Sequence, residues 1–170
     1  MPENTARDLG LRCEELAHGQ AATVFPLLRE AIPGLSLRSW LRFARRAGGH
    51  GRAGQSGIMV VRRAPRPMPC GLFIWRRDDD LEHGALLVAE HLVGIDLLDP
   101  EPVTAVLVRE LEALAMRLGC GGIRTMMIRC DAPIAAQLLA AGHAKEGAAM
   151  FKPTGRQPDA NWQSSPKPKR

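Results

Sequence analysis

The amphipathic segment that follows residues 99–100 constrains the fold of this chain more than any other feature. Its apolar side chains recur at helical spacing and form one stripe: Val103, Val106, Leu107, Leu111, Leu114, Ala115 and Leu118. Asp99 can cap the segment, Pro100 suits a first helical turn, and Gly119 ends it. A stripe of this kind must be buried against another element, and the apolar runs before it can supply a sheet.

Short apolar runs separated by turn residues surround this helix. Strands are predicted over residues 11–17, 57–62, 71–76, 86–97 and 123–129, helices over 18–31, 36–46, 99–118 and 133–141, and one or two further strands between 143 and 152. Three prolines between residues 63 and 69 mark a turn, so the runs on either side predict an antiparallel hairpin. The order β-α-α-β-β-β-α-β-α-β predicts an α/β (α+β) fold, with helices covering a mixed, mostly antiparallel sheet.

The chain length of 170 residues suits one domain, predicted over residues 11–152. Residues 1–10 are predicted to be flexible. Residues 153–170 lack the apolar content needed for packing and predict a disordered basic tail. From Lys152 onward, five basic residues and one acid supply +4 of the net charge of +5. The body of the protein is therefore nearly neutral, and we do not expect it to bind nucleic acid.

The sequence gives little support for a membrane-spanning protein or for a metal-binding protein. No apolar run reaches the length needed to cross a bilayer, and residues 1–12 carry charges of both signs, so we expect a cytoplasmic protein. The four cysteines show no Cys-x-x-Cys spacing and no paired histidines at ligand distance. They predict reduced thiols that pack as small apolar groups, and no metal site.

Two groups of charged residues are predicted to lie on the solvent-exposed surface. A helix capped by Ser36 would place its arginines on one outward face: Arg38, Arg42, Arg45 and Arg46. The run Arg77-Asp78-Asp79-Asp80 predicts a charged turn after the second strand of the hairpin, since nothing with ligand character is spaced around the aspartates.

Local motifs in the second half resemble a known superfamily. Leu111-Glu112, Ala115 and Gly119 match a Leu-Glu-x-x-Ala-x-x-x-Gly pattern, and the stretch from Met68 to Ile74 matches a pattern of hairpin, glycine and strand. Further positions fall where the same superfamily has Asn, Ala, Tyr and Gly-Phe: Asp131, Ala135, Leu138 and Gly142-His143. With the element order, these positions make residues 11–152 similar to the GNAT N-acetyltransferase superfamily.

The resemblance implies acetyl-CoA as cofactor and a small-molecule or peptide amine as acceptor. Glu90 and His91 are the catalytic candidates, because some members place near Glu90 a carboxylate that deprotonates the amine through water. Neighbouring residues of a strand point to opposite faces, so at most one of the pair faces the substrate. A polar pair at the edge of the core is the open alternative. The implied cofactor-binding residues are Val93, Gly94, Ile95, Val103, Thr104, Asp131 and Leu138.

The loop before the central helix departs from the superfamily pattern Arg/Gln-x-x-Gly-x-Gly/Ala. It reads Asp99-Pro100-Glu101-Pro102-Val103-Thr104: no glycine remains, the prolines have no N–H, and two acids face a phosphate site. Two functions therefore stay open, an acyl-CoA-dependent N-acyltransferase with a divergent cofactor site and a catalytically inactive module that binds a small molecule or a protein partner. A homodimer is compatible with either function, and a nucleic-acid role for the tail is the third alternative.

Overall fold

A computed structural model describes residues 10–48, 54–65, 68–95, 101–127 and 132–147. Its elements are β1 (Leu11–Glu15), the 3-10 helix η1 (His18–Val24), α1 (Phe25–Ala31), α2 (Leu37–Ala47), β2 (Ser56–Arg63), β3 (Pro69–Asp80), β4 (Gly84–Gly94), α3 (Glu101–Arg117), β5 (Gly122–Met126) and α4 (Ala132–Ala140). One five-stranded sheet has the order β1-β2-β3-β4-β5. Its first four strands pair antiparallel, and β5 pairs parallel with β4. The predicted α/β class with a mostly antiparallel sheet is confirmed.

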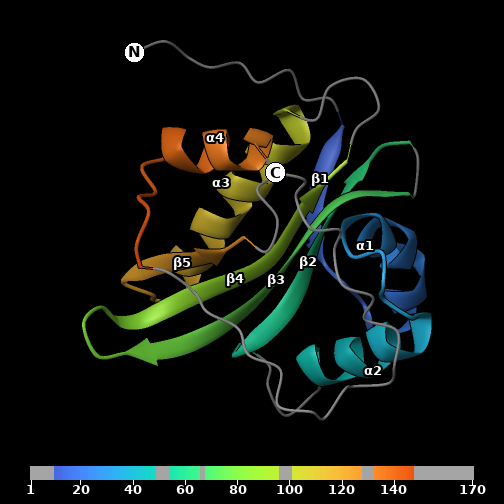
Figure 1. Cartoon of the computed structure of the whole chain (residues 1–170), viewed down its shortest axis with the longest axis horizontal. Helices are drawn as coiled ribbons and strands as arrows, with labels where there is room; N and C mark the ends of the chain where they lie inside the picture. Colours follow the sequence, from blue (N-terminus) through green and yellow to red (C-terminus); the bar gives the residue numbers. More distant parts are fainter. Residues whose placement is uncertain (1–9, 49–53, 66–67, 96–100, 128–131, 148–170) are drawn as a thin grey trace, which may run out of the picture.

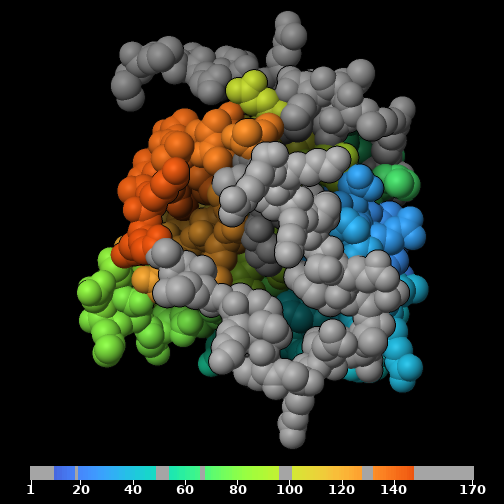
Figure 2. Space-filling view, in the orientation of Figure 1, coloured from blue at the N-terminus to red at the C-terminus, as the bar shows by residue number. Residues whose placement is uncertain are grey.

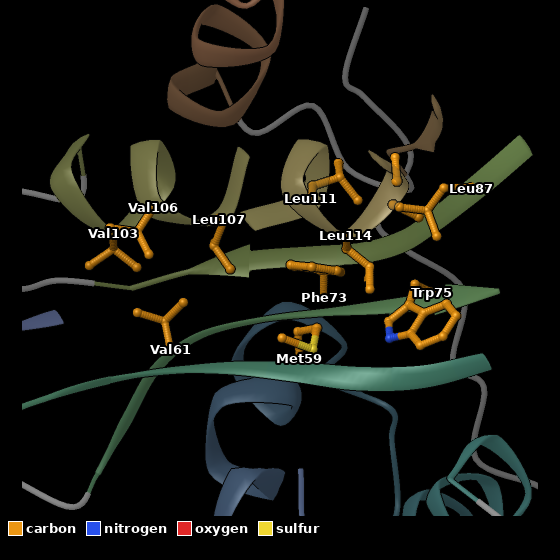
Figure 3. Close-up of a cluster of buried hydrophobic side chains, with 12 residues drawn as sticks. Met59, Val61, Phe73, Trp75, Leu87, Val103, Val106, Leu107, Leu111 and Leu114 are labelled. Carbon is orange, nitrogen blue, oxygen red and sulfur yellow. The ribbon is translucent and has the colours of Figure 1, made fainter. Parts of the chain in front are cut away.

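Two helical layers cover the two faces of the sheet (Figure 1). On one face, α3 packs its apolar stripe onto β2, β3 and β4, and Figure 3 shows the side chains of helix and strands interleaved. On the other face, η1, α1 and α2 close a second cluster around the buried Trp40. The indole N–H of Trp40 donates a hydrogen bond of 2.6 Å to the backbone oxygen of Ala21, which ties α2 to η1. No helix of the described ranges is long and apolar enough to cross a membrane.

Several element boundaries follow from local chemistry. Ser36 caps α2 as predicted, because its side chain accepts a hydrogen bond from the backbone N–H of Ser39. The four arginines of α2 are exposed, as predicted. The predicted helix over 18–31 is divided into η1 and α1, since Pro26 lies in the first turn of α1 and has no N–H to continue the preceding helix.

The predicted turn over Arg77–Asp80 is wrong. These residues continue β3, and Asp78 and Asp80 stand opposite Leu86 and Gly84 of β4. The chain reverses at residues 81–83 instead. The partner strand is apolar and long, so its backbone groups hold β3 in the ladder despite the run of charges.

The other boundary predictions have mixed outcomes. Residues 143–147 form no strand, and the rest of the strand region expected there lies outside the described residues. Position 99, the predicted cap of α3, also lies outside them. The strand predicted over 123–129 is described to residue 126, and α4 is found one residue before its predicted range.

Candidate active site at the branch of β4

The candidate site lies where β4 separates from β5. β4 pairs with β3 from Gly84 to Gly94, but its pairing with β5 runs only from Leu86 to Glu90. The last pair of the parallel ladder is Glu90 with Met126. Among the described residues, no β5 residue pairs with the final four residues of β4. That edge can therefore offer backbone N–H and C=O groups to a ligand.

A β-bulge lies where this described ladder ends. Between the pairs Ile74–Glu90 and Leu72–Val93, β4 holds one residue more than β3. Within the bulge His91 has φ of 51°, in the left-handed region that a residue with a Cβ rarely adopts. A bulge bends its strand and increases the local twist, so the residues on either side of it are oriented differently from those of a regular strand.

Glu90 is held by an arginine of the adjacent strand. Its carboxylate is paired with the guanidinium of Arg76, which also lies 3.6 Å from the carboxylate of Asp78. Glu90 shares its face of the sheet with its pairing partner Ile74, on the side of α1 and α2. The carboxylate therefore already has a cationic partner, and this partner restrains its position.

His91 has the properties of a proton acceptor. Its side chain is partly buried, and this burial lowers the pKa of the imidazole below its usual value of 6.5, against the opposing effect of the charge on Glu90. The ring is therefore mainly neutral at pH 7 and has a nitrogen lone pair available. No hydrogen bond within the described chain occupies the ring. Of the two catalytic candidates, His91 is thus the freer base.

The predicted cofactor residues of β4 and α3 meet through backbone rather than through side chains. Val93 packs in the cluster under α1 and α2, whereas Val103 is fully buried under α3 on the opposite face. Between them, a Cβ on Gly94 would lie 3.4 Å from Oγ1 of Thr104, which is itself 1 % exposed. This is an ordinary van der Waals distance, so Gly94 lies beside the first turn of α3 and a small side chain would fit there.

The remaining predicted residues lie away from this contact. The backbone N–H of Ile95 donates to the oxygen of Cys70 at 2.8 Å, and its side chain packs toward α1 and α2. Leu138 is buried with Ile134 and Val108 between α3 and α4. Position 131, the predicted Asp131, lies outside the described residues.

The N-terminus of α3 does not fit a pyrophosphate. The carboxylate of Glu101 stands at the positive end of the helix dipole and accepts a hydrogen bond of 3.2 Å from the amide of Gln137 in α4. Pro102 supplies no N–H in the first turn. A phosphate at this helix end would meet a negative charge that α4 holds in place, and it would find fewer backbone donors.

A group of charged side chains at the other end of β4 was not predicted. We call Asp80, His83, Arg124 and Glu146 the Asp80 cluster. Asp80 lies 3.0 Å from Nδ1 of His83 and 2.8 Å from Nη1 of Arg124, and Glu146 lies 3.3 Å from Nε2 of His83 and 3.6 Å from Nη2 of Arg124. The cluster joins the β3–β4 hairpin to β5 and to the segment after α4, whose surfaces meet in Figure 2.

The charges of the Asp80 cluster favour one another. Hydrogen bonds from His83 and then Arg124 lower the pKa of Asp80 far below its usual value. The bond to Asp80 and the charge of Glu146 raise the pKa of His83. Glu82, His83 and Glu146 bring ligand-type atoms within 4.8 Å of one another, but all three are exposed and both ring nitrogens of His83 face carboxylates of the cluster. The sequence could not reveal this cluster, because it depends on strand register.

Two of the described cysteines, Cys13 and Cys70, are packed against the α3 cluster. Burial raises the pKa of the Cys13 thiol to about 12, so it remains protonated at neutral pH. The thiol of Cys70 lies 3.4 Å from the backbone oxygen of Val61 and packs against the α3 cluster. Both behave as the small apolar groups that the sequence predicted.

Comparison with solved structures identifies the fold. An aminoglycoside N-acetyltransferase in complex with CoA superposes with a TM-score of 0.71 at 9 % identity, covering 85 % of this chain and 95 % of that one. Glucosamine-6-phosphate N-acetyltransferase from Arabidopsis thaliana gives 0.67 at 12 %, covering 85 % and 98 %. Ribosomal-protein-alanine N-acetyltransferase from Brucella melitensis biovar Abortus 2308 gives 0.67 at 13 %, covering 85 % and 99 %.

The chain therefore has the GNAT fold, as its element order and helix pattern indicated. No protein-family model matches the sequence, and no curated protein matches it. At identities this low the similarity defines the architecture, and the chemistry must be argued from the side chains at the branch.

Proposed function

We propose that this protein is an N-acyltransferase that moves an acyl group from a thioester to an amine at the branch of β4. The observation that carries the proposal is the bulge at His91, which lies where the described β4–β5 ladder ends and places a neutral imidazole beside Glu90. The shared fold with N-acetyltransferases supports the same reaction class.

The proposed chemistry requires little from the side chains. His91 accepts a proton from the ammonium group of the acceptor, and the freed amine attacks the thioester carbonyl carbon. A C–N bond forms and the C–S bond breaks, and the thiolate that leaves takes up the proton that the attacking nitrogen loses as it becomes an amide. Glu90, restrained by Arg76, stabilises the imidazolium that forms next to it. Most of the rate would come from holding donor and acceptor side by side.

The donor would be bound by its amide-bearing arm along the free edge of β4. In the described part of the chain, the first turn of α3 offers the diphosphate of acetyl-CoA a negative charge at Glu101 and no N–H at Pro102. We therefore expect S-acetylpantetheine, which lacks the nucleotide and phosphates, to bind within about threefold of acetyl-CoA, because the phosphates add no contact. Calorimetric titration of both compounds into the full chain measures this ratio. If acetyl-CoA binds tenfold or more tightly than S-acetylpantetheine, the expectation is wrong.

The transfer itself is tested by incubating the chain with either donor and a panel of primary amines, with mass spectrometry of the acylated amine as readout. His91→Gln should lower the rate about 10²- to 10⁴-fold, because a positioned base contributes that much. His83→Gln is the matched control, since it makes the same change at the far end of β4 and should leave the rate intact. If no donor yields an amide with any amine, the proposal fails.

A second function, a non-catalytic binding module, is favoured by one observation. Glu101 and Pro102 close the anion site that a nucleotide-bearing donor would need. This candidate predicts no heat with acetyl-CoA or S-acetylpantetheine, together with no product. Binding of either donor at micromolar concentration, which corresponds to about −8 kcal/mol, would exclude it.

A further inference from the structure

A pocket of about 990 Å³ lies at the β5 edge of the molecule, apart from the branch of β4. It is lined by β5, the C-terminal half of α3, α4, the segment after α4, and His83 and Leu86 of the β3–β4 hairpin. Neither Glu90 nor His91 is among the described residues that line it. Its size is in the range of sites that enclose small organic molecules.

One polar group of the pocket, a threonine hydroxyl, lacks a partner. The hydroxyl of Thr125 is buried and has no hydrogen-bond partner within the described chain. It belongs to β5 and faces the α3 side, because Thr125 pairs with Ala89 of the α3 cluster. A buried hydroxyl without a partner has lost the hydrogen bonds that water would give it, so a ligand that supplies one is favoured.

The charges of the pocket favour a cation. The Asp80 cluster reaches the pocket rim, but its two acids and two bases balance one another. Two charged residues remain: Lys145, which is exposed at the rim, and Glu112 of α3, which is partly buried in the wall. Glu112 has no ion-pair partner among the described residues. Water screens the rim charge more than the wall charge, so the interior attracts a positive group.

The apolar side chains that line the pocket favour a ligand with a flat aromatic ring. Met116 and Leu139 are 76 % and 55 % exposed and line the pocket, as do Met127 and Leu138. Methionine side chains adapt to irregular shapes and contact aromatic rings favourably through sulfur. Two methionines that face one pocket thus offer adjustable walls to an aromatic ring.

We propose that this pocket binds a small aromatic amine, with its ring against Met116 and Met127, its ammonium group at Glu112 and a polar atom at Thr125. Of the residues that the resemblance implied for catalysis and for the cofactor, Leu138 lines this pocket and Glu90 and His91 do not. Its ligand would bind whether or not the branch of β4 is catalytic.

Three probes that share an indole ring test the proposal: tryptamine, the neutral tryptophol and the anionic indole-3-propionate. The full chain carries ¹³C-methyl methionine, and each probe is titrated while the methyl resonances are followed. Tryptamine should shift Met116 and Met127, which line the pocket, and leave Met59 and Met68 in place. It should bind about tenfold more tightly than indole-3-propionate, in keeping with a charge-assisted hydrogen bond.

Two isosteric variants separate the contributions of Glu112 and Thr125 to the binding of the probes. Glu112→Gln should reduce the affinity for tryptamine to that for tryptophol, and Thr125→Val should weaken all three probes about three- to tenfold. Both changes keep the shape of the side chain, and the unchanged Met59 resonance reports that the core is intact. The proposal is overturned if no probe shifts Met116 and Met127 at millimolar concentration, or if the acid binds as tightly as the amine.

Discussion

The two ends of β4 differ in how many partners they have. From Leu86 to Glu90 the strand is hydrogen-bonded on both edges, and the Asp80 cluster joins its hairpin to β5 and to the segment after α4. Beyond Glu90 the strand keeps β3 on one edge and has no described β5 partner on the other. The first end is a scaffold, and the second is a candidate binding edge.

This difference does not come from hydrophobicity. Leu87, Val88 and Ala89 at the paired end and Val93 at the separated end are all buried. What differs is one extra residue, His91, in a left-handed conformation. The comparison teaches that a single bulge can mark the boundary between a strand segment paired on both edges and a segment that is a candidate binding edge.

The largest expected effect concerns the base at the separated end. If His91 takes the proton, kcat/KM for acyl transfer should decline at acidic pH with a midpoint below 6.5, because burial lowers the pKa of the imidazole. His91→Gln should remove this decline together with the 10²- to 10⁴-fold rate advantage. Initial rates between about pH 5 and 9 measure both. A decline that persists in the variant would assign the base to another group.

The next effect concerns packing at the paired end. Leu87→Ala removes a fully buried side chain from the α3 cluster and should lower the free energy of unfolding by about 2–5 kcal/mol. Leu81→Ala at the exposed hairpin tip is the control and should change it by less than about 0.5 kcal/mol. Urea denaturation of the variants measures both. Similar values for the two would mean that the hairpin end is not the scaffold.

A third comparison uses two glycines that stand opposite each other across β3 and β4. A Cβ on Gly71 would lie 2.9 Å from Cγ1 of Val103, so Gly71→Ala should cost about 1–3 kcal/mol in stability. A Cβ on Gly94 would have 3.4–3.5 Å to its neighbours, so Gly94→Ala should cost less. Thermal unfolding of the two variants measures both stability losses. A larger loss for Gly94→Ala than for Gly71→Ala would contradict the packing of α3 against these strands.

The smallest effect concerns the Asp80 cluster. The raised pKa of His83 means that its stabilising contribution is complete below its unfolded value of 6.5 and is lost as the pH rises through the higher folded pKa. Asp80, whose pKa is lowered, contributes above 3.8 and loses its contribution as the pH falls through the folded pKa. His83→Gln should therefore lower Tm more near pH 6 than near pH 9. Melting curves of the variant and the unmodified chain at both pH values measure this difference. An equal change of Tm at both pH values would exclude a contribution from the titration of His83.

Local features could be predicted from the sequence because they depend on residues a few positions apart. The stripe of α3 and the cap at Ser36 are spacing effects, and the closed anion site follows from the identities of Glu101 and Pro102. The order of such elements also resembled that of the GNAT fold, and the similarity to solved structures confirmed it.

Strand register and side-chain pairing were decided only by the tertiary structure. The sequence offered Glu90 and His91 as equals, and the fold separated them by pairing Glu90 with Arg76, fourteen positions earlier, and by placing the bulge at His91. It likewise changed a predicted turn into the end of β3 and brought Asp80 to Arg124. Such contacts join distant positions, and no local period encodes which residues of two strands will meet.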